Sequence, residues 1–272
     1  VAGLRATLSL ADGHAYQDLS PEFANIIAEL PILWTASEHT LVPDAEERFR
    51  HAFASLAGSP AMAQRRFFKV CPSASSSIDV IGAVLAALKL RTSLVEPTFD
   101  NLPLLLRRRG VVLDVVHEDD LHVGKVMSPS LSRRDGALFL VQPNNPTGER
   151  LSAGALLDIA EHCRRRNTLL VLDNSFRFYD REPYDDYAVL AETGVAFIAF
   201  EDTGQVWPTH DLKASLLFCS PELENLVNDI YSESYLCNSR FALAVLSRFM
   251  QQTAWAGVAH ALCATVASHR AA

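Results

Sequence analysis

The sequence has no apolar run that approaches the roughly 20 residues of a membrane-spanning helix, and no basic segment followed by apolar residues opens it as in a signal peptide. Cysteine is also scarce, with five residues that are widely separated and never form a C-x-x-C pair. This spacing predicts neither a disulfide framework nor a zinc site. We therefore expect a cytoplasmic protein with free thiols, no bound metal and no contact with a membrane.

Positive charge is in short supply as well. The 24 lysines and arginines are outnumbered by 32 acidic residues, which gives a formal net charge of −8. The two triple-arginine runs, residues 107–109 and 164–166, fall near the ends of predicted helices, where cations complement the helix dipole. Because no basic patch is concentrated anywhere, the sequence argues against a nucleic-acid partner.

From about residue 77 the pattern alternates between helices and short strands. Helices are predicted over 77–90, 101–109 and 152–166, and strands over 92–95, 111–116, 138–141, 168–172, 195–200 and 215–218. Such alternation predicts an α/β fold with three layers, a mostly parallel sheet with helices on both faces. In sheets of this kind, ligands bind at the carboxyl ends of the strands.

The chain is expected to have three parts. Residues 1–20 form an N-terminal arm, residues 21–220 the large α/β domain, and residues 221–272 a segment that is helical to its end. Where the arm meets the large domain, Ser20 and Pro21 begin one helix, and Gly58 ends another that covers residues 44–57. No internal repeat or low-complexity linker interrupts this order.

Two loops at predicted strand ends suit a phosphorylated aromatic ligand. The run of residues 71–77, Cys-Pro-Ser-Ala-Ser-Ser-Ser, leads directly into a helix, whose free N–H groups and dipole would bind a phosphate together with Ser73, Ser75 and Ser76. An ordinary serine N-cap has the same appearance. In the loop Pro-Thr-Phe-Asp-Asn at 97–101, Phe99 would stack on a flat ring or belong to the core.

Two further strand ends carry hydrogen-bonding groups. Asn145 lies in the turn Pro-Asn-Asn-Pro-Thr-Gly at 143–148, a composition that a chance turn can also have. Asp173 closes a buried strand, where a carboxylate needs a partner, and Ser175 and Arg177 follow it. A helix-capping or salt-bridged aspartate is the alternative interpretation of Asp173.

The segment most informative about the family is 201–213, Glu-Asp-Thr-Gly-Gln-Val-Trp-Pro-Thr-His-Asp-Leu-Lys. It resembles the Schiff-base segment of fold-type-I enzymes that use pyridoxal phosphate (PLP), and most closely that of the PLP-dependent L-arginine oxidases of antibiotic biosynthesis. The arm at 11–17, the loop at 97–101 and the strand end at 173–177 resemble the same group. The similarity therefore extends from about residue 7 to the end of the chain.

The resemblance implies a role for each candidate residue. Asp173 would pair with the pyridine nitrogen of PLP, Asn145 with the ring oxygen, and Phe99 would stack on the ring. The phosphate would be held by the serines and by a lysine, and Ser175 belongs to the same cofactor-binding set: Ser73, Ser75, Ser76, Ser175 and Lys213. The predicted catalytic groups are those of the arm, the strand ends and the lysine position: Asp12, His14, Asp173, Arg177 and Gln205.

Two departures from the family pattern affect function. The group has its Schiff-base lysine where this chain has Gln205, and an amide can form no such bond. Lys213 occupies the phosphate position, and Lys69, Lys89 and Lys125 match no family motif. Family members also continue into a small C-terminal domain with a substrate-binding arginine, a domain expected to be missing here. An engineered substitution explains one loss, whereas a natural relative that gave up the parent reaction explains both.

Three functions are compatible with these observations. The first is a degenerate homologue repurposed for PLP-independent chemistry or ligand binding in a natural-product pathway, with a small molecule in the former PLP cleft and PLP, if present, bound without a covalent bond. The second is an arginine oxidase or aminotransferase-like enzyme inactivated by substitution and truncation. The third is a non-catalytic scaffold. A homodimer is expected in each case.

Overall fold

The computed structural model describes residues 19, 21–121, 134–180 and 182–264. In these ranges the chain forms the following helices, strands and short helical turns (η): α1 Pro21–Glu38, α2 Val42–Leu56, α3 Pro60–Ala63, β1 Lys69–Cys71, α4 Ala74–Ala87, β2 Thr92–Glu96, α5 Asn101–Arg108, β3 Leu113–His117, η2 Glu118–Leu121, β4 Ala137–Val141, α6 Ala153–Arg165, β5 Leu169–Asp173, η3 Arg177–Tyr179, α7 Asp186–Thr193, β6 Phe197–Asp202, β7 Ser215–Cys219, η4 Pro221–Leu223, α8 Glu224–Ser234, α9 Arg240–Ala256 and η5 Ala259–Cys263.

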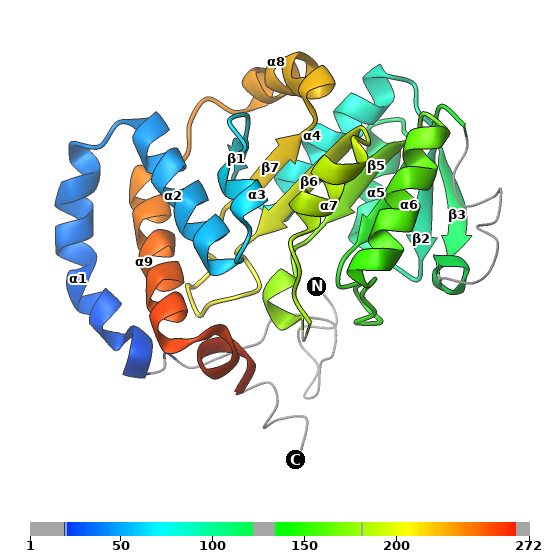
Figure 1. Cartoon of the computed structure of the whole chain (residues 1–272). Helices are drawn as coiled ribbons and strands as arrows, with labels where there is room; N and C mark the ends of the chain where they lie inside the picture. Colours follow the sequence, from blue (N-terminus) through cyan, green and yellow to red (C-terminus); the bar gives the residue numbers. More distant parts are fainter. Residues whose placement is uncertain (1–18, 20, 122–133, 181, 265–272) are drawn as a thin grey trace, which may run out of the picture.

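One sheet organises the chain, with the strand order β1-β7-β6-β5-β4-β2-β3 (Figure 1). The five strands from β6 to β3 in this order are parallel, whereas β7 is antiparallel to both β6 and β1. The central strands are apolar along their whole length because both faces are covered. The predicted mostly parallel α/β sheet is therefore confirmed.

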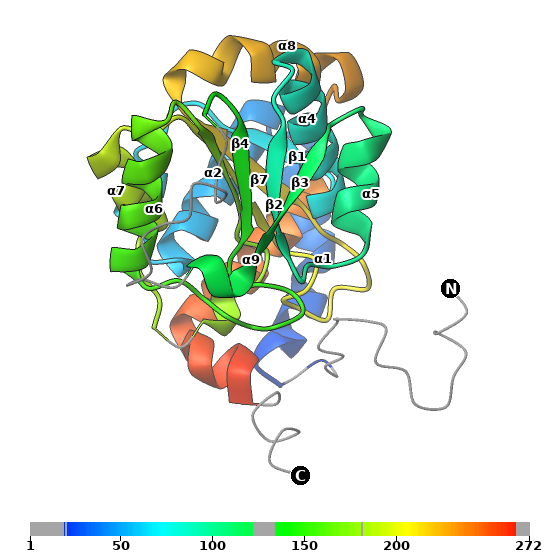
Figure 2. The ribbon, with the colours of Figure 1, turned by 90° about the vertical axis from the view of Figure 1, so that its right-hand side faces the viewer.

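Helices cover the two faces of the sheet, as seen along its edge in Figure 2. Helices α4, α5 and α8 lie on one side, over a core that contains Ile81, Val171 and Phe200. Helices α6 and α7 cover the other side, over a core that includes Leu172 and Tyr187. Since side chains alternate along a strand, Asp173 and Asp202 project toward the α4 side, whereas Glu201 projects toward the α7 side.

The C-terminal part of the described chain packs on its N-terminal part. Helix α9 lies against both α1 and α2, and the ring of Phe249 in α9 contacts that of Phe23 in α1 with centroids 5.0 Å apart. Trp207 joins this layer to the site described below, because its indole donates a hydrogen bond to Thr253 at 2.9 Å.

Several sequence-based boundaries need correction. The segment from residue 221 is not continuously helical, because the chain is extended at Tyr235 and α9 begins only after Ser239 caps it. The strand expected over 111–116 is β3, which begins at Leu113, since the N–H of Val111 donates to the carbonyl of Leu106 at the end of α5. Strand β1 and helix α7 were not predicted. None of the helices in the described ranges is long and apolar enough to span a bilayer.

Candidate ligand site at the carboxyl ends of the strands

Three strand ends and one helix end meet at the same edge of the sheet. In the register of the sheet, Asp173 at the end of β5 is level with Val141, which ends β4, and with Phe200 in β6. The N-terminus of α4 reaches the same place, because the backbone N–H of Ala74 donates to Oδ1 of Asp202 at 3.0 Å. The edge where sequence analysis predicted a site therefore gathers two buried carboxylates and a helix N-terminus.

Asp173 is fully buried and only half of its carboxylate is used by the protein. The backbone N–H and the hydroxyl of Ser175 donate to Oδ1 at 2.9 and 2.6 Å, whereas Oδ2 has no hydrogen-bond partner in the described ranges. Burial raises the pKa of the Asp173 carboxyl to about 7; the two bonds from Ser175 oppose the rise, and the charges of Asp202 and Glu201 add to it. A cation at Oδ2 would hold this carboxylate in its ionised form.

The serines at the start of α4 are partly occupied by the helix itself. The hydroxyl of Ser73 caps the helix by accepting from the N–H of Ser76 at 3.2 Å, and the two hydroxyls lie 3.1 Å apart. Ser75 is exposed, and its hydroxyl makes no hydrogen bond to the residues that the structure describes. The N-cap interpretation thus holds for Ser73, while Ser75 and Ser76 keep groups that can face an anion.

Asp202 is a site residue to which sequence analysis assigned no role. Its carboxylate accepts the N–H groups of Ala74 and Gly204 at 3.0 and 2.8 Å. Burial raises its pKa to about 6, against these bonds and the nearby ammonium group of Lys213. A Cβ on Gly204 would lie only 2.8 Å from Oδ2 of Asp202 and 3.1 Å from the Lys213 side chain, so this close approach requires glycine. The sequence signal that could have identified Asp202 is its position at the end of the predicted strand over 195–200.

Asn145 and Phe99 lie in the loops that follow β4 and β2. The side chain of Asn145 is half-buried and makes no hydrogen bond to the described residues, so it is available to a ligand. Its neighbour Asn144 has a structural role, because its amide donates to the backbone oxygen of Pro97 and to Glu118 at 2.9 and 2.7 Å. Phe99 packs partly against the core under α4, on the face to which Asp173 points.

Gln205 stands in the turn that follows β6. The Tyr179 hydroxyl donates to its backbone carbonyl at 2.9 Å and so fixes the turn. The side-chain oxygen Oε1 is buried and accepts no hydrogen bond from any described residue. An acceptor buried without a donor costs about 1–3 kcal/mol. Because this oxygen is closed off from solvent although no ligand is bound, it does not line an open site.

No lysine in the described ranges takes the place of the lysine that the resemblance predicts at position 205. Lys69 donates to Asn228 of α8 at 2.7 Å, and Lys89 follows the C-terminal end of α4, opposite the serines. Lys213 lies beside Gly204 and Asp202, and its phosphate-binding role stays a prediction. Lys125 lies outside the described residues, as do Asp12 and His14 of the arm.

Arg177 is held on the opposite side of the sheet end. Its buried guanidinium donates to both carboxylate oxygens of Glu201, at 2.8 and 2.7 Å, and lies 2.5 Å from Asp186. Tyr187 donates to the same glutamate at 3.0 Å. Through these bonds the guanidinium joins η3 to β6 and α7, which favours a positioning role beneath the site over a direct catalytic one.

The groups at this edge fit PLP in most respects. Asp173 offers a free carboxylate oxygen for a protonated ring nitrogen, Asn145 a free amide, and Ser75 and Lys213 groups for a phosphate. The Asp202 carboxylate already accepts one N–H of the α4 N-terminus, so the helix has one N–H fewer with which to bind an anion. A bound cofactor would supply an electron-accepting ring. Position 205, where the resemblance predicts the attaching lysine, is occupied by glutamine.

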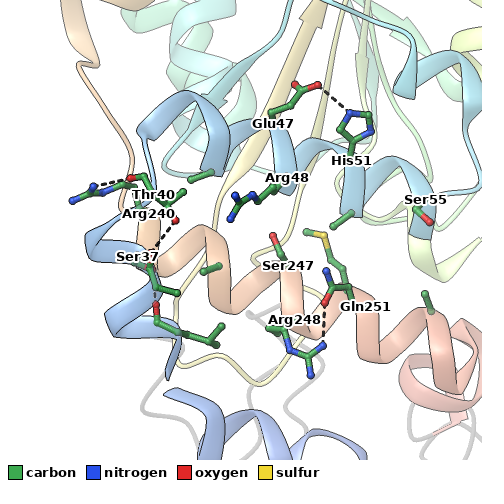
Figure 3. A pocket seen from close by; sticks show the side chains of 17 residues that line it. Ser37, Thr40, Glu47, Arg48, His51, Ser55, Arg240, Ser247, Arg248 and Gln251 are labelled. Atoms are coloured by element: carbon green, nitrogen blue, oxygen red, sulfur yellow. Dashed lines mark hydrogen bonds and ion pairs between the residues drawn. The ribbon is translucent and has the colours of Figure 1, made fainter. Parts of the chain in front are cut away.

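Away from this edge, a groove of about 650 Å³ lies between α1, α2 and α9 (Figure 3). Arg48 extends into it from α2, and Ala244 and Ser247 of α9 contribute small side chains to its wall. None of the predicted site residues in the described ranges lines this groove.

Comparisons with known proteins agree with this geometry. The profile of the family "Aminotransferase class I and II" matches residues 16–197. The fold is similar to a solved structure of MppP soaked with the product 2-ketoarginine, with a TM-score of 0.85 and 41% identity over 93% of this chain and 72% of that chain.

More distant similarities were also found. A putative aminotransferase from Burkholderia pseudomallei shares the fold at a TM-score of 0.63 and 20% identity, over 92% of this chain and 72% of that chain. A threonine-phosphate decarboxylase from Sinorhizobium is 28% identical over 134 residues, which are 49% of this chain and only 37% of that enzyme. The match thus spans well under half the length of this curated relative.

Proposed function

Because the chain belongs to the class I and II aminotransferase family, we propose that it is a homologue that binds a vitamin B6 phosphate in the ancestral cleft without attaching it covalently. In this role it would serve PLP-independent chemistry or ligand binding in a natural-product pathway. The observation that carries the proposal is the combination of Gln205 at the lysine position with an otherwise retained set of cofactor-type groups around Asp173.

The retained groups support ligand binding. Each of them would contact a different part of a B6 phosphate: Asp173 the ring nitrogen, Asn145 the ring oxygen, and Ser75 with Lys213 the phosphate. A cleft without a ligand gains nothing from burying Asp173, whose ionisation is opposed by its surroundings. Occupation by a cationic ring would remove this cost.

The experiment is a titration of the purified protein with PLP, followed by quenching of tryptophan fluorescence and by equilibrium dialysis. We expect saturable binding that dialysis reverses. Asp173→Ala should weaken it at least about tenfold, since a hydrogen-bonded ion pair is lost. Asp229→Ala on the exterior of α8 is the matched control and should bind as the parent does. Equal affinity in both variants would contradict the proposal.

A second candidate function is an arginine oxidase or aminotransferase-like enzyme disabled by substitution, and the 41% identity to MppP favours it. In that case Gln205→Lys, supplied with PLP, should turn yellow and act on arginine with release of hydrogen peroxide. A colourless Gln205→Lys protein would argue against this candidate.

A homodimer remains part of the proposal, with the non-catalytic scaffold as the third candidate. Sedimentation of the purified protein would give the oligomeric state. A scaffold should tolerate Asp173→Ala without loss of its cellular role, whereas a ligand-dependent protein should not.

A further inference from the structure

The groove between α1, α2 and α9 has the size and the walls of a small-molecule site. Its volume of about 650 Å³ lies within the roughly 300–1,000 Å³ that is usual for such sites. Apolar side chains come from each of the three helices: Leu33 and Ala36 from α1, Ala52 from α2, and Ala244 and Met250 from α9.

Three hydroxyl groups in the groove are used by the helices that carry them. Ser37, Thr40 and Ser247 donate to backbone oxygens four residues earlier, at 2.7, 2.9 and 2.7 Å. A ligand in the groove therefore meets no free hydroxyl donor at these three positions, which favours an apolar body for the ligand.

Two of the three arginines that line the groove are already bound by the protein. Arg240 donates to the backbone oxygen of Thr40 at 2.7 Å, where its charge complements the negative end of α1. Arg248 donates to both carboxylate oxygens of Glu29 at 2.7 and 2.9 Å. The charges of these two arginines are thus compensated within the chain.

Arg48 is the third arginine, and its charge is not compensated. Its side chain extends from α2 into the open groove (Figure 3), and its guanidinium has no hydrogen-bond or ion-pair partner among the described residues. Glu47, the only acid among the lining residues, accepts from Arg50 at 3.0 Å instead and lies 3.0 Å from the ring of His51. Because a planar guanidinium binds a carboxylate through two parallel hydrogen bonds, this arginine suits a carboxylate ligand.

We propose that this groove binds an elongated apolar monocarboxylate, such as a medium-chain fatty acid, with its carboxylate on Arg48 and its apolar part along the walls from α1 and α9. Such a ligand carries one charge, which matches the one unpaired arginine of the described lining. An acidic peptide would bring further carboxylates, for which these lining residues hold no further unpaired cation. The groove lies away from the strand ends, so the proposal does not depend on whether a B6 phosphate binds.

Two probes with the same chain separate the charge from the apolar contacts. Decanoate carries a carboxylate, whereas decanol has an uncharged hydroxyl in its place. Dissociation constants are measured by isothermal titration calorimetry at neutral pH, with both probes below the concentrations at which they aggregate. We expect saturable binding of decanoate, and binding of decanol that is weaker by about tenfold or more, since a hydrogen-bonded ion pair is lost.

Two variants test the place of binding. Arg48→Met removes the charge and should weaken decanoate by about tenfold or more while it leaves decanol unchanged. Ala244→Leu fills part of the groove and should weaken both probes. Arg164→Met, in the last turn of α6, is the matched control on an exposed arginine and should bind both probes as the parent does.

Three results would overturn the proposal. The first is a parent protein that decanoate does not saturate, or that binds decanol equally well. The second is Arg48→Met that binds decanoate as tightly as the parent does. The third is a parent that ignores decanoate but binds a polyglutamate peptide through Arg48, which would assign the groove to an acidic protein partner.

Discussion

The substitution Asp173→Asn should make the unliganded protein more stable at alkaline pH. The raised pKa of about 7 means that the native state holds the Asp173 proton more tightly than the unfolded chain, whose reference value is 3.8. The stability that this proton contributes is fully present below the unfolded pKa and is lost as the pH rises through the native pKa. Between pH 5 and pH 8, this stability is lost mainly over the two pH units from pH 5 to the native pKa of about 7. At about 1.4 kcal/mol per unit, the loss is about 3 kcal/mol.

Asparagine removes the charge and keeps an oxygen that can accept from Ser175. Urea unfolding of the two proteins without B6 compounds, at pH 5 and at pH 8, measures the effect. We expect the variant to gain up to about 3 kcal/mol relative to the parent between the two pH values, as an upper bound, because Asp202 also titrates in this range. The same stability difference at both pH values would refute the claim that the native structure opposes ionisation of Asp173.

Three further predictions concern the frame of the site. Gly204→Ala should cost about 1–3 kcal/mol in urea unfolding, because the new Cβ meets the carboxylate of Asp202; Gly154→Ala, with open space around it, should be neutral or stabilising. Arg177→Met should cost about 3–5 kcal/mol because it leaves buried carboxylates unpaired; the exposed Arg165→Met should cost less than about 1 kcal/mol. Tyr179→Phe should leave the fold intact yet weaken PLP binding, since it frees the turn at Gln205.

The architecture could be predicted because the central strands are apolar on both faces. The runs that became β4, β5 and β6 are continuous apolar segments bounded by turn residues, a pattern that only a covered sheet explains. Strand β1 was missed because three residues carry no periodicity, and it forms by pairing with the distant β7. The break at Tyr235 could not be predicted because no glycine or proline lies there. The segment after α8 is held instead by tertiary hydrogen bonds, such as that from the side chain of Asn238 to the backbone oxygen of Val70.

The site could be located from sequence at the level of strand ends but not of individual partners. Asp173 and its interaction with Ser175 follow from adjacent residues, whereas the contact of Asp202 with α4 joins positions 128 residues apart. Arg177 was grouped with the catalytic residues because it follows Asp173, and only the side-chain alternation of β6 reveals that Glu201 draws it to the opposite face. Local sequence cannot distinguish a free arginine from a paired one.

The proposed function requires that this chain form no covalent bond with PLP. The measurement is the intact mass of the protein after incubation with PLP and reduction with borohydride, beside Gln205→Lys treated in the same way. We predict that the parent keeps its own mass after dialysis although it binds PLP reversibly, while Gln205→Lys gains the mass of one reduced cofactor. A parent protein that carries one stoichiometric cofactor after reduction would contradict the account.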